Sequence, residues 1–329
     1  MGKSVIKAIT SRINYQWFLF LTLIVLLLVF NSLTDGVIMK RNVIFRQTEN
    51  VMEMGIIALA MTLVIATGGI DLSVGYTMAL SAIMLGLVYQ TTESIILALV
   101  VCLVTGVLCG ALNGIIIARA NIPPLVTTLA TFSLYTGICK VIAGSNIFST
   151  FPKGMTFLIT HRLFGIIPYQ FVLFLALAAI FAFFFNRTRY GRYLRGMGFN
   201  EQTIRFSGVN IGLVKFNVYV LAGLMSSIAA IVYLCRLPAA KPDIGININL
   251  ETITAVVLGG TSIVGGIASI VGTVLSILIL GVLRKGLSLI GMGGDKYNFI
   301  LGIILVICLI GFSVLNGQIS LRRKGRARE

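Results

Sequence analysis

Long apolar runs, separated by short polar or glycine- and proline-rich stretches, make up most of the chain. A helix needs about 20 apolar residues to cross a membrane, and the punctuated runs predict about ten such helices. The pattern therefore predicts an all-α, polytopic membrane fold that forms one domain over residues 1–329. The predicted helices lie at 16–31, 51–67, 73–90, 94–117, 123–143, 168–186, 212–236, 252–264, 265–290 and 297–317.

The composition agrees with a membrane protein. Of the 329 residues, 57% are hydrophobic and 11% are charged, and the mean hydropathy is +1.01. Soluble domains carry about 25% charged residues. The first apolar run follows a basic flank, as in a signal peptide. No small-residue cleavage site follows it, so we expect an uncleaved first helix.

The net charge of +16 raises the question of a nucleic-acid partner. The sequence has no basic groove with interleaved aromatics, so we expect no such partner. In membrane proteins, Lys and Arg mark cytoplasmic segments. They are densest in 187–215 and in the basic tail 319–329, which predicts a multi-pass inner-membrane protein with both termini cytoplasmic. Lys40, Arg41 and Arg46, in the first predicted outside loop, do not fit this orientation.

Residues 67–75, TGGIDLSVG, place a carboxylate inside an apolar region. A charged residue at the centre of a lipid-exposed helix costs about 2.5–3.5 kcal/mol. Gly68 and Gly69 can break the helix, and Asp71 or Ser73 can cap the next one. We expect Gly68, Gly69, Asp71, Ser73 and Gly75 to form this broken helix. Two interpretations are open: an architectural role beside a translocation path, or direct contact with a solute.

A second glycine-rich stretch, LGGTSIVGG at 258–266, separates two later runs. Non-helical backbone at membrane depth requires protein or a water-filled cavity around it. Segments 51–90 and 252–290 can therefore each form a broken helix or a re-entrant hairpin in place of two clean membrane-spanning helices. The similarity of the two stretches fits an internal repeat, as in many transporters, or the glycines of any packed bundle. The glycines of the second stretch are Gly259, Gly260, Gly265 and Gly266.

The longest polar stretch runs over about 187–211 and is rich in arginine. Asn200 can cap a short helix through EQTIRFS, and Gly208 can end it. A capped helix in a cytoplasmic loop favours a docking surface for a partner over a loop that only touches anionic lipid. The docking residues that we expect are Asn200, Glu201, Arg205, Ser207 and Gly208.

Two further motifs concern helix packing. NIPPLVTTLAT at 121–131 predicts a helix start with proline in the first turn and threonines that face other helices. Glycines at 106, 110 and 114 form one small face, which predicts close packing within the chain.

Several kinds of chemistry have no matching residues. There is no phosphate-binding loop, nucleophile triad or metal-ligand spacing, so we expect no catalytic residue, no metal and no cofactor. The five cysteines are expected to be reduced and buried. Only Glu53, Asp71 and Lys140 are expected as ionisable groups within the membrane, too few for an ion-coupled carrier.

Four segments occur in an order that resembles one family. They are GGIDLSVG at 68–75, NIPPLVTTLAT at 121–131, TRYGRYLRGMGFNEQTIRFSGVN at 188–210 and LETITAVVLGGTSIVGG at 250–266. The chain, from about residue 50 to 315, resembles the permease subunits of bacterial ATP-binding-cassette importers of the ribose, galactose, xylose and autoinducer-2 type. One departure is that Ile267 and Ala268 stand where the family often has arginine and glycine.

The resemblance implies a permease that is not itself an enzyme. It implies a second permease copy or a related permease, cytoplasmic ATP-binding subunits that dock around Asn200–Gly208, and an extracytoplasmic solute-binding protein. Membrane lipid surrounds the assembly. We expect the cargo to be a small polar solute, a monosaccharide in the first place. The alternatives are autoinducer-2 or another small polar solute, a secondary carrier or channel without ATP, and a membrane-embedded enzyme.

Overall fold

The computed structural model describes residues 2–40, 43, 45–157 and 161–315. Within that part of the chain, seven helices are long and apolar enough to cross a membrane. They are α1 (Gly2–Leu33), α5 (Val74–Thr92), α6 (Ile95–Arg119), α7 (Pro124–Ala143), α9 (Tyr169–Arg187), α12 (Ile211–Arg236) and α14 (Ile270–Leu289).

Shorter or less apolar elements complete the fold. The helices among them are α3 (Arg46–Glu49), α4 (Met52–Ala66), α10 (Arg189–Phe199), α11 (Glu201–Phe206), α13 (Ile248–Leu258) and α15 (Gly294–Leu315), with 3-10 helices η1 (Lys153–Thr156) and η2 (Pro242–Gly245). Strands β1 (Arg162–Leu163) and β2 (Ile167–Pro168) form a small antiparallel hairpin.

Each predicted apolar run contains a helix, so the all-α polytopic fold is confirmed. A count of ten crossings is not confirmed, because α4 has 15 residues and α13 has 11. The predicted run 252–264 is wrong in its bounds. Helix α13 starts at Ile248 and ends at Leu258, where Gly260, with φ of +85°, takes a left-handed conformation that glycine adopts without strain.

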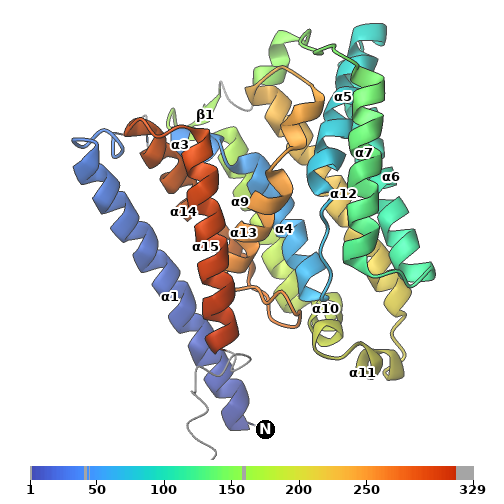
Figure 1. The fold of residues 1–329 in the computed structure, drawn as a ribbon, viewed down its shortest axis with the longest axis vertical. Coiled ribbons are helices and arrows are strands. Elements are labelled where there is room, and N and C mark those ends of the chain that lie inside the picture. Colours follow the sequence, from blue (N-terminus) through green and yellow to red (C-terminus); the bar gives the residue numbers. More distant parts are fainter. Residues whose placement is uncertain (1, 41–42, 44, 158–160, 316–329) are drawn as a thin grey trace, which may run out of the picture.

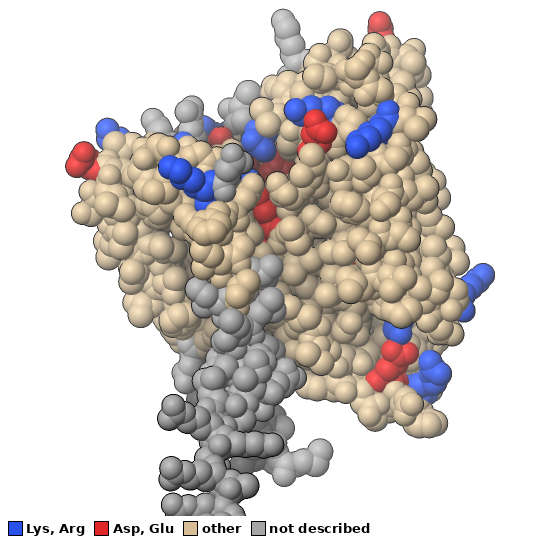
Figure 2. Space-filling view, viewed as in Figure 1, with Lys and Arg blue, Asp and Glu red and all other residues tan. Residues whose placement is uncertain are grey.

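The two ends of the molecule differ (Figure 1). One end carries α10, α11 and the N-terminal part of α1, and we call it the α11 end. The other carries α3 and the β1–β2 hairpin, and we call it the hairpin end. Figure 2 shows Lys, Arg, Asp and Glu mostly at these two ends, with a broad uncharged band between them. Such a band fits the apolar interior of a bilayer.

Helix α6 packs closely on α12. A Cβ on Gly114 would lie 2.9 Å from the carbonyl oxygen of Phe216, and one on Gly110 would lie 3.0 Å from the Cα of Val220. The small face at 106, 110 and 114 therefore serves packing within the chain, as predicted. The start of α7 also agrees with its prediction, since Pro124 is its first residue and Thr127, Thr128 and Thr131 are buried.

Candidate functional site

The two glycine-rich stretches reverse the direction of the chain. Helix α4 runs towards the α11 end and α5 runs away from it, and α13 and α14 repeat this arrangement (Figure 1). Each of the segments 51–90 and 252–290 is therefore a helical hairpin with a non-helical turn, in which the second helix, α5 or α14, is long and apolar enough to cross a membrane. The reversals lie over 67–73 and 259–269, outside any helix.

The two reversals touch each other. The backbone N–H of Gly266 donates to the carbonyl of Ala66 over 2.9 Å, and the side chains of Thr62 and Thr273 are hydrogen-bonded over 2.9 Å. A Cβ on Gly265 would lie 2.8 Å from the backbone nitrogen of Gly68. Gly265 also has φ of +97°, so both its conformation and its neighbours require glycine. Segments separated by two hundred residues thus form one backbone junction.

Helix α10 closes this junction from the α11 end. A Cβ on Gly198 would overlap backbone atoms of both Gly266 and Ala66. The aromatic ring of Phe199 covers Gly266, with a Cβ there 2.7 Å from the ring. Helix α10, which directly precedes the segment predicted for docking, therefore lies on both glycine-rich reversals.

The first reversal contains a buried polar network. Asp71 is 2% exposed, and its Oδ1 accepts the backbone N–H of Ser73 over 2.8 Å and the Ser73 hydroxyl over 2.7 Å. Asn113 on α6 donates to the Ser73 hydroxyl over 2.8 Å, and Thr128 on α7 donates to the carbonyl of Ile70 over 3.1 Å. Asp71 thus orders the turn before α5. Ser73 is the residue at the helix start, but its hydroxyl does not cap α5.

Two glycines of this reversal fit against neighbouring elements. A Cβ on Gly69 would lie 2.5 Å from the hydroxyl of Tyr219 on α12, a buried hydroxyl that has no hydrogen-bond partner among the described residues. Gly75, at the start of α5, packs against the backbone of Gly245 in η2. The reversal is therefore held between α12 on one side and η2 on the other.

The docking segment has the predicted local structure. The side chain of Asn200 accepts the N–H of Thr203 over 3.0 Å at the start of α11, and Gly208, with φ of +80°, follows its end. Glu201 pairs with Lys215 on α12 over 2.7 Å and lies 3.6 Å from Arg205. The Ser207 hydroxyl donates to the carbonyl of Thr203 over 3.0 Å.

Helix α10 is also fixed to its neighbours. The Tyr190 hydroxyl donates to the carbonyl of Val214 at the start of α12 over 3.0 Å, and burial raises the pKa of this hydroxyl. The guanidinium of Arg195 donates to the carbonyl of Phe185 over 2.7 Å and stacks over its ring. Arg195 therefore makes a structural contact with α9, whereas the side chain of Arg205 is exposed.

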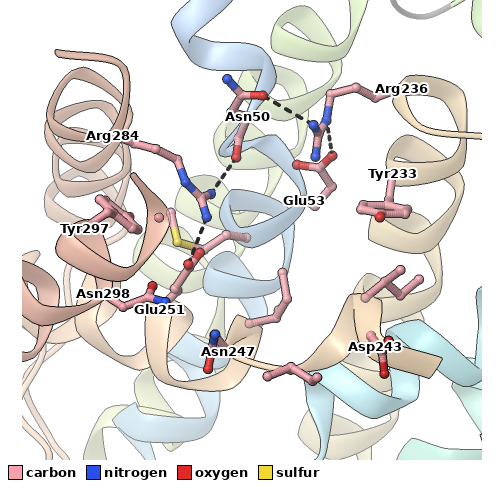
Figure 3. A pocket seen from close by; sticks show the side chains of 15 residues that line it. Asn50, Glu53, Tyr233, Arg236, Asp243, Asn247, Glu251, Arg284, Tyr297 and Asn298 are labelled. Atoms are coloured by element: carbon pink, nitrogen blue, oxygen red, sulfur yellow. Dashed lines mark hydrogen bonds and ion pairs between the residues drawn. The ribbon is translucent and has the colours of Figure 1, made fainter. Parts of the chain in front are cut away.

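A charged cavity lies towards the hairpin end, and sequence reasoning missed most of it. Arg236 on α12 donates to Glu53 on α4 over 2.8 Å, and Arg284 on α14 donates to Glu251 on α13 over 3.0 Å. Asn50 joins the two pairs: its side-chain oxygen accepts from Arg236 over 3.3 Å and its backbone carbonyl from Arg284 over 3.0 Å (Figure 3). Glu53 is 3% exposed and Glu251 is 4% exposed.

The expected set of ionisable groups was incomplete. Glu53 and Asp71 are buried as expected, and Lys140 is exposed near the end of α7. Of the four charged groups that form the ion pairs of this cavity, Glu53 alone was expected, and Arg236, Glu251 and Arg284 were missed. The sequence did contain a signal for these residues, since each arginine and each glutamate lies in or next to an apolar helix. Their pairing could not be predicted, because the partners are far apart in the sequence.

The cavity between these pairs has a volume of about 250 Å³. The ion pairs and Tyr233 and Tyr297 form one part of its wall, and Ile244 and Ile248, next to the start of α5, form another. Figure 2 shows acidic side chains deep in a hollow of the surface, at the half of the molecule away from α11. No group of three or more His, Cys, Asp or Glu side chains suited to a metal ion occurs among the described residues.

Comparison with known proteins gives a family. The model of the branched-chain amino acid transport system permease component matches residues 43–309. The autoinducer 2 import system permease protein LsrD of Photorhabdus luminescens is 34% identical over 312 residues, which cover 93% of each chain. LsrD of Yersinia pseudotuberculosis is 34% identical over 308 residues, 92% of each chain. No solved structure matches the chain.

Relatives of this kind are transport permeases and not enzymes, and in such systems partner subunits hydrolyse ATP. The seven long apolar helices, the uncharged band and the matched range all agree with a multi-pass membrane permease. The chain belongs to the family of permease components typified by the branched-chain amino acid transport system, within the binding-protein-dependent, ATP-driven importers.

Proposed function

We propose that this chain forms the membrane path of an ATP-driven importer for a small polar solute, either a monosaccharide or autoinducer-2. The observation that carries the proposal is the contact of α10 with both glycine-rich reversals, at Gly198. A partner that moves α10 and α11 would move the backbone on both sides of the path at once. Gly68, Gly69, Asp71, Ser73 and Gly75 frame the first side, and Gly259, Gly260, Gly265 and Gly266 frame the second.

The names of the relatives bear on the choice between the two proposed cargoes. Those at 33–34% identity are named as autoinducer 2 import permeases, which supports autoinducer-2 as the cargo. The polar wall of the cavity supports a hydroxylated solute of either kind.

The partners follow from the exposed surface at the α11 end. Phe206 on α11 is 88% exposed, outside the helices that can cross a membrane. An exposed aromatic side chain in water suits an interface. We propose that Asn200, Glu201, Arg205, Ser207 and Gly208 present α11 to a cytoplasmic ATP-binding subunit. The α11 end and both termini would then be cytoplasmic, and the hairpin end would receive solute from a binding protein. A second copy or a related permease would complete the path.

The experiment is uptake in cells from which the gene has been deleted. The probes are radiolabelled D-ribose, D-xylose and D-galactose, and removal of autoinducer-2 from the medium. We expect uptake of one probe to fall to background and to return when the gene is supplied on a plasmid. Unchanged uptake of all four probes would contradict the proposed cargo.

A matched deletion of the ATP-binding subunit gene separates the importer from a secondary carrier. An importer loses uptake in both deletions. Uptake that persists without any ATP-binding subunit would favour the carrier.

A further inference from the structure

We infer that the cavity between the Glu53–Arg236 and Glu251–Arg284 pairs is a binding site for an uncharged, polyhydroxylated solute about the size of a monosaccharide. This inference rests on the proposed function and adds to it a site, its residues and a charge preference. The site lies in the half of the membrane path nearest the hairpin end.

Stability alone explains the two ion pairs poorly. They join four elements, α4, α12, α13 and α14, and place two carboxylates of 3% and 4% exposure inside the bundle. Replacing a buried ion pair with apolar side chains of similar volume is often neutral or stabilising, because desolvation offsets the attraction. Ionisable groups inside a membrane bundle more often mark a solute pathway.

The pairs leave hydrogen-bonding groups for a hydroxylated guest. A guanidinium has five N–H groups. In the described part of the chain, Arg236 donates to Glu53 and Asn50, and Arg284 donates to Asn50 and Glu251, one bond to each. One oxygen of each carboxylate accepts these bonds, which leaves the second oxygen as an acceptor. A hydroxyl both donates and accepts, so it can bind such a pair without separating it.

The hydroxyl of Tyr297 points to the same conclusion. Tyr297 lines the cavity, is 3% exposed, and its hydroxyl has no hydrogen-bond partner among the described residues. A buried polar group without a partner costs free energy, which a bound solute would recover. Its ring already packs under the guanidinium of Arg284, 4.7 Å from the ring centroid.

Charge and size restrict the solute. The cavity is lined by three carboxylates, with Asp243 as the third, and by two guanidinium groups, so an anion is disfavoured. A zwitterion such as a branched-chain amino acid would have to separate the existing pairs to satisfy its own charges. Pockets for drug-sized ligands measure about 300–1,000 Å³. A volume of about 250 Å³ suits a smaller solute.

The test uses the complete importer in cells and the probe whose uptake depends on this gene. Tyr297→Phe removes only the hydroxyl, and Asp243→Asn removes one charge from an exposed wall residue, so neither disturbs an ion pair. Tyr297→Phe removes one hydrogen bond, and Asp243→Asn replaces a charged acceptor with a weaker, neutral one. We therefore expect each to lower the maximal uptake rate by about two- to tenfold. Tyr89→Phe, a matched loss of a hydroxyl on α5 outside the cavity, should leave uptake unchanged. The amount and the size-exclusion profile of the protein should stay the same in all three.

The outcomes separate the two proposals. If no probe depends on the gene, the proposed function fails and the site fails with it. If a probe is imported and both Tyr297→Phe and Asp243→Asn transport it like the wild type, the site is wrong while the importer stands. If excess L-leucine competes with uptake and excess unlabelled sugar or autoinducer-2 does not, the preference for an uncharged solute is wrong.

Discussion

The described hydrogen bonds of the Asp71 carboxylate come from Ser73, two residues later in the same turn. Its Oδ1 receives two bonds from Ser73, and Ser73 receives one from Asn113 on α6. These bonds satisfy a buried charged group and fix the entry to α5. At this scale the architectural interpretation of TGGIDLSVG has direct geometric support, and direct contact with a solute remains a hypothesis.

The two interpretations of Asp71 predict different behaviour for the variant Asp71→Asn. Asparagine keeps an oxygen that can accept both bonds from Ser73, whereas alanine keeps none. For an architectural role, we expect Asp71→Asn to import nearly like the wild type. Asp71→Ala should lose about 1–3 kcal/mol of stability, as buried donors are left unsatisfied. Thermal unfolding in detergent and uptake of the gene-dependent probe measure the two effects. Loss of uptake in a stable, well-inserted Asp71→Asn protein would instead indicate solute contact.

Local sequence was enough to predict residues whose partners lie nearby in the chain. Asn200 caps α11 through a bond to Thr203, and Pro124 starts α7. The cavity could not be predicted in this way. Glu53 and Arg236 are 183 residues apart, and Glu251 and Arg284 are 33 apart, so no periodic pattern relates them. The contact of Gly265 with Gly68 was missed for the same reason.

Helix α11 is a short element fixed at its start and through Ile204. Asn200 caps its start, and Glu201 ties it to Lys215 on α12 over 2.7 Å. Ile204 packs against Gly196 on α10, where a Cβ would leave too little room for the isoleucine side chain. The element is therefore coupled to two others by one ion pair and one apolar contact.

A charge exchange tests whether this coupling matters. Glu201→Lys places like charges next to Lys215, so we expect the uptake rate to fall by about two- to fivefold, since partly exposed pairs contribute about 0–1 kcal/mol. The double variant Glu201→Lys with Lys215→Glu restores opposite charges and should recover uptake. The measurement is initial uptake rate at equal membrane content. If the double variant does not recover uptake, Glu201 acts through another contact, such as one with the ATP-binding subunit.

The bounds of α7 and α9 were predicted to within one residue, whereas α13 ends six residues before the predicted end at 264. Helix α10 was not expected as an element of its own, because its arginines and glycines suggested only a polar loop. The structure shows why it forms: Thr188 caps it, accepting the N–H of Gly191 over 3.2 Å, and Arg195 and Tyr190 fix it to α9 and α12. Those contacts come from tertiary packing.

At the scale of the whole molecule, the charged cavity lies near one end and the segment proposed for docking lies at the other. The elements α4 and α14 connect them. Helix α4 runs from Glu53 to Ala66 at the junction, and α14, which carries Arg284, begins four residues after Gly266. A shift of α10 against the junction would thus reach the cavity through two helices.

Gly198 is the residue at which that connection can be blocked. Gly198→Ala introduces a Cβ that overlaps backbone atoms of Gly266 and Ala66, which no side-chain rotation relieves. We expect a loss of about 1–3 kcal/mol of stability, typical of overpacking, and loss of uptake. Thermal unfolding and uptake measure these effects.

Gly137→Ala on α7 is the matched control, because nothing lies within 4 Å of a Cβ there. It should leave both stability and uptake at wild-type values or raise stability slightly, since alanine favours helices. Wild-type behaviour of Gly198→Ala would show that the junction is looser than the structure indicates.

The hydrogen bond from Gly266 to Ala66 also bears on biogenesis. A ribosome makes Ala66 long before Gly266. Until residue 266 has been made, the carbonyl of Ala66 lacks this partner, and an unpaired backbone group is costly away from water. The first glycine-rich reversal therefore cannot take its final form during synthesis of the early helices. Its folding must wait for the later half of the same chain.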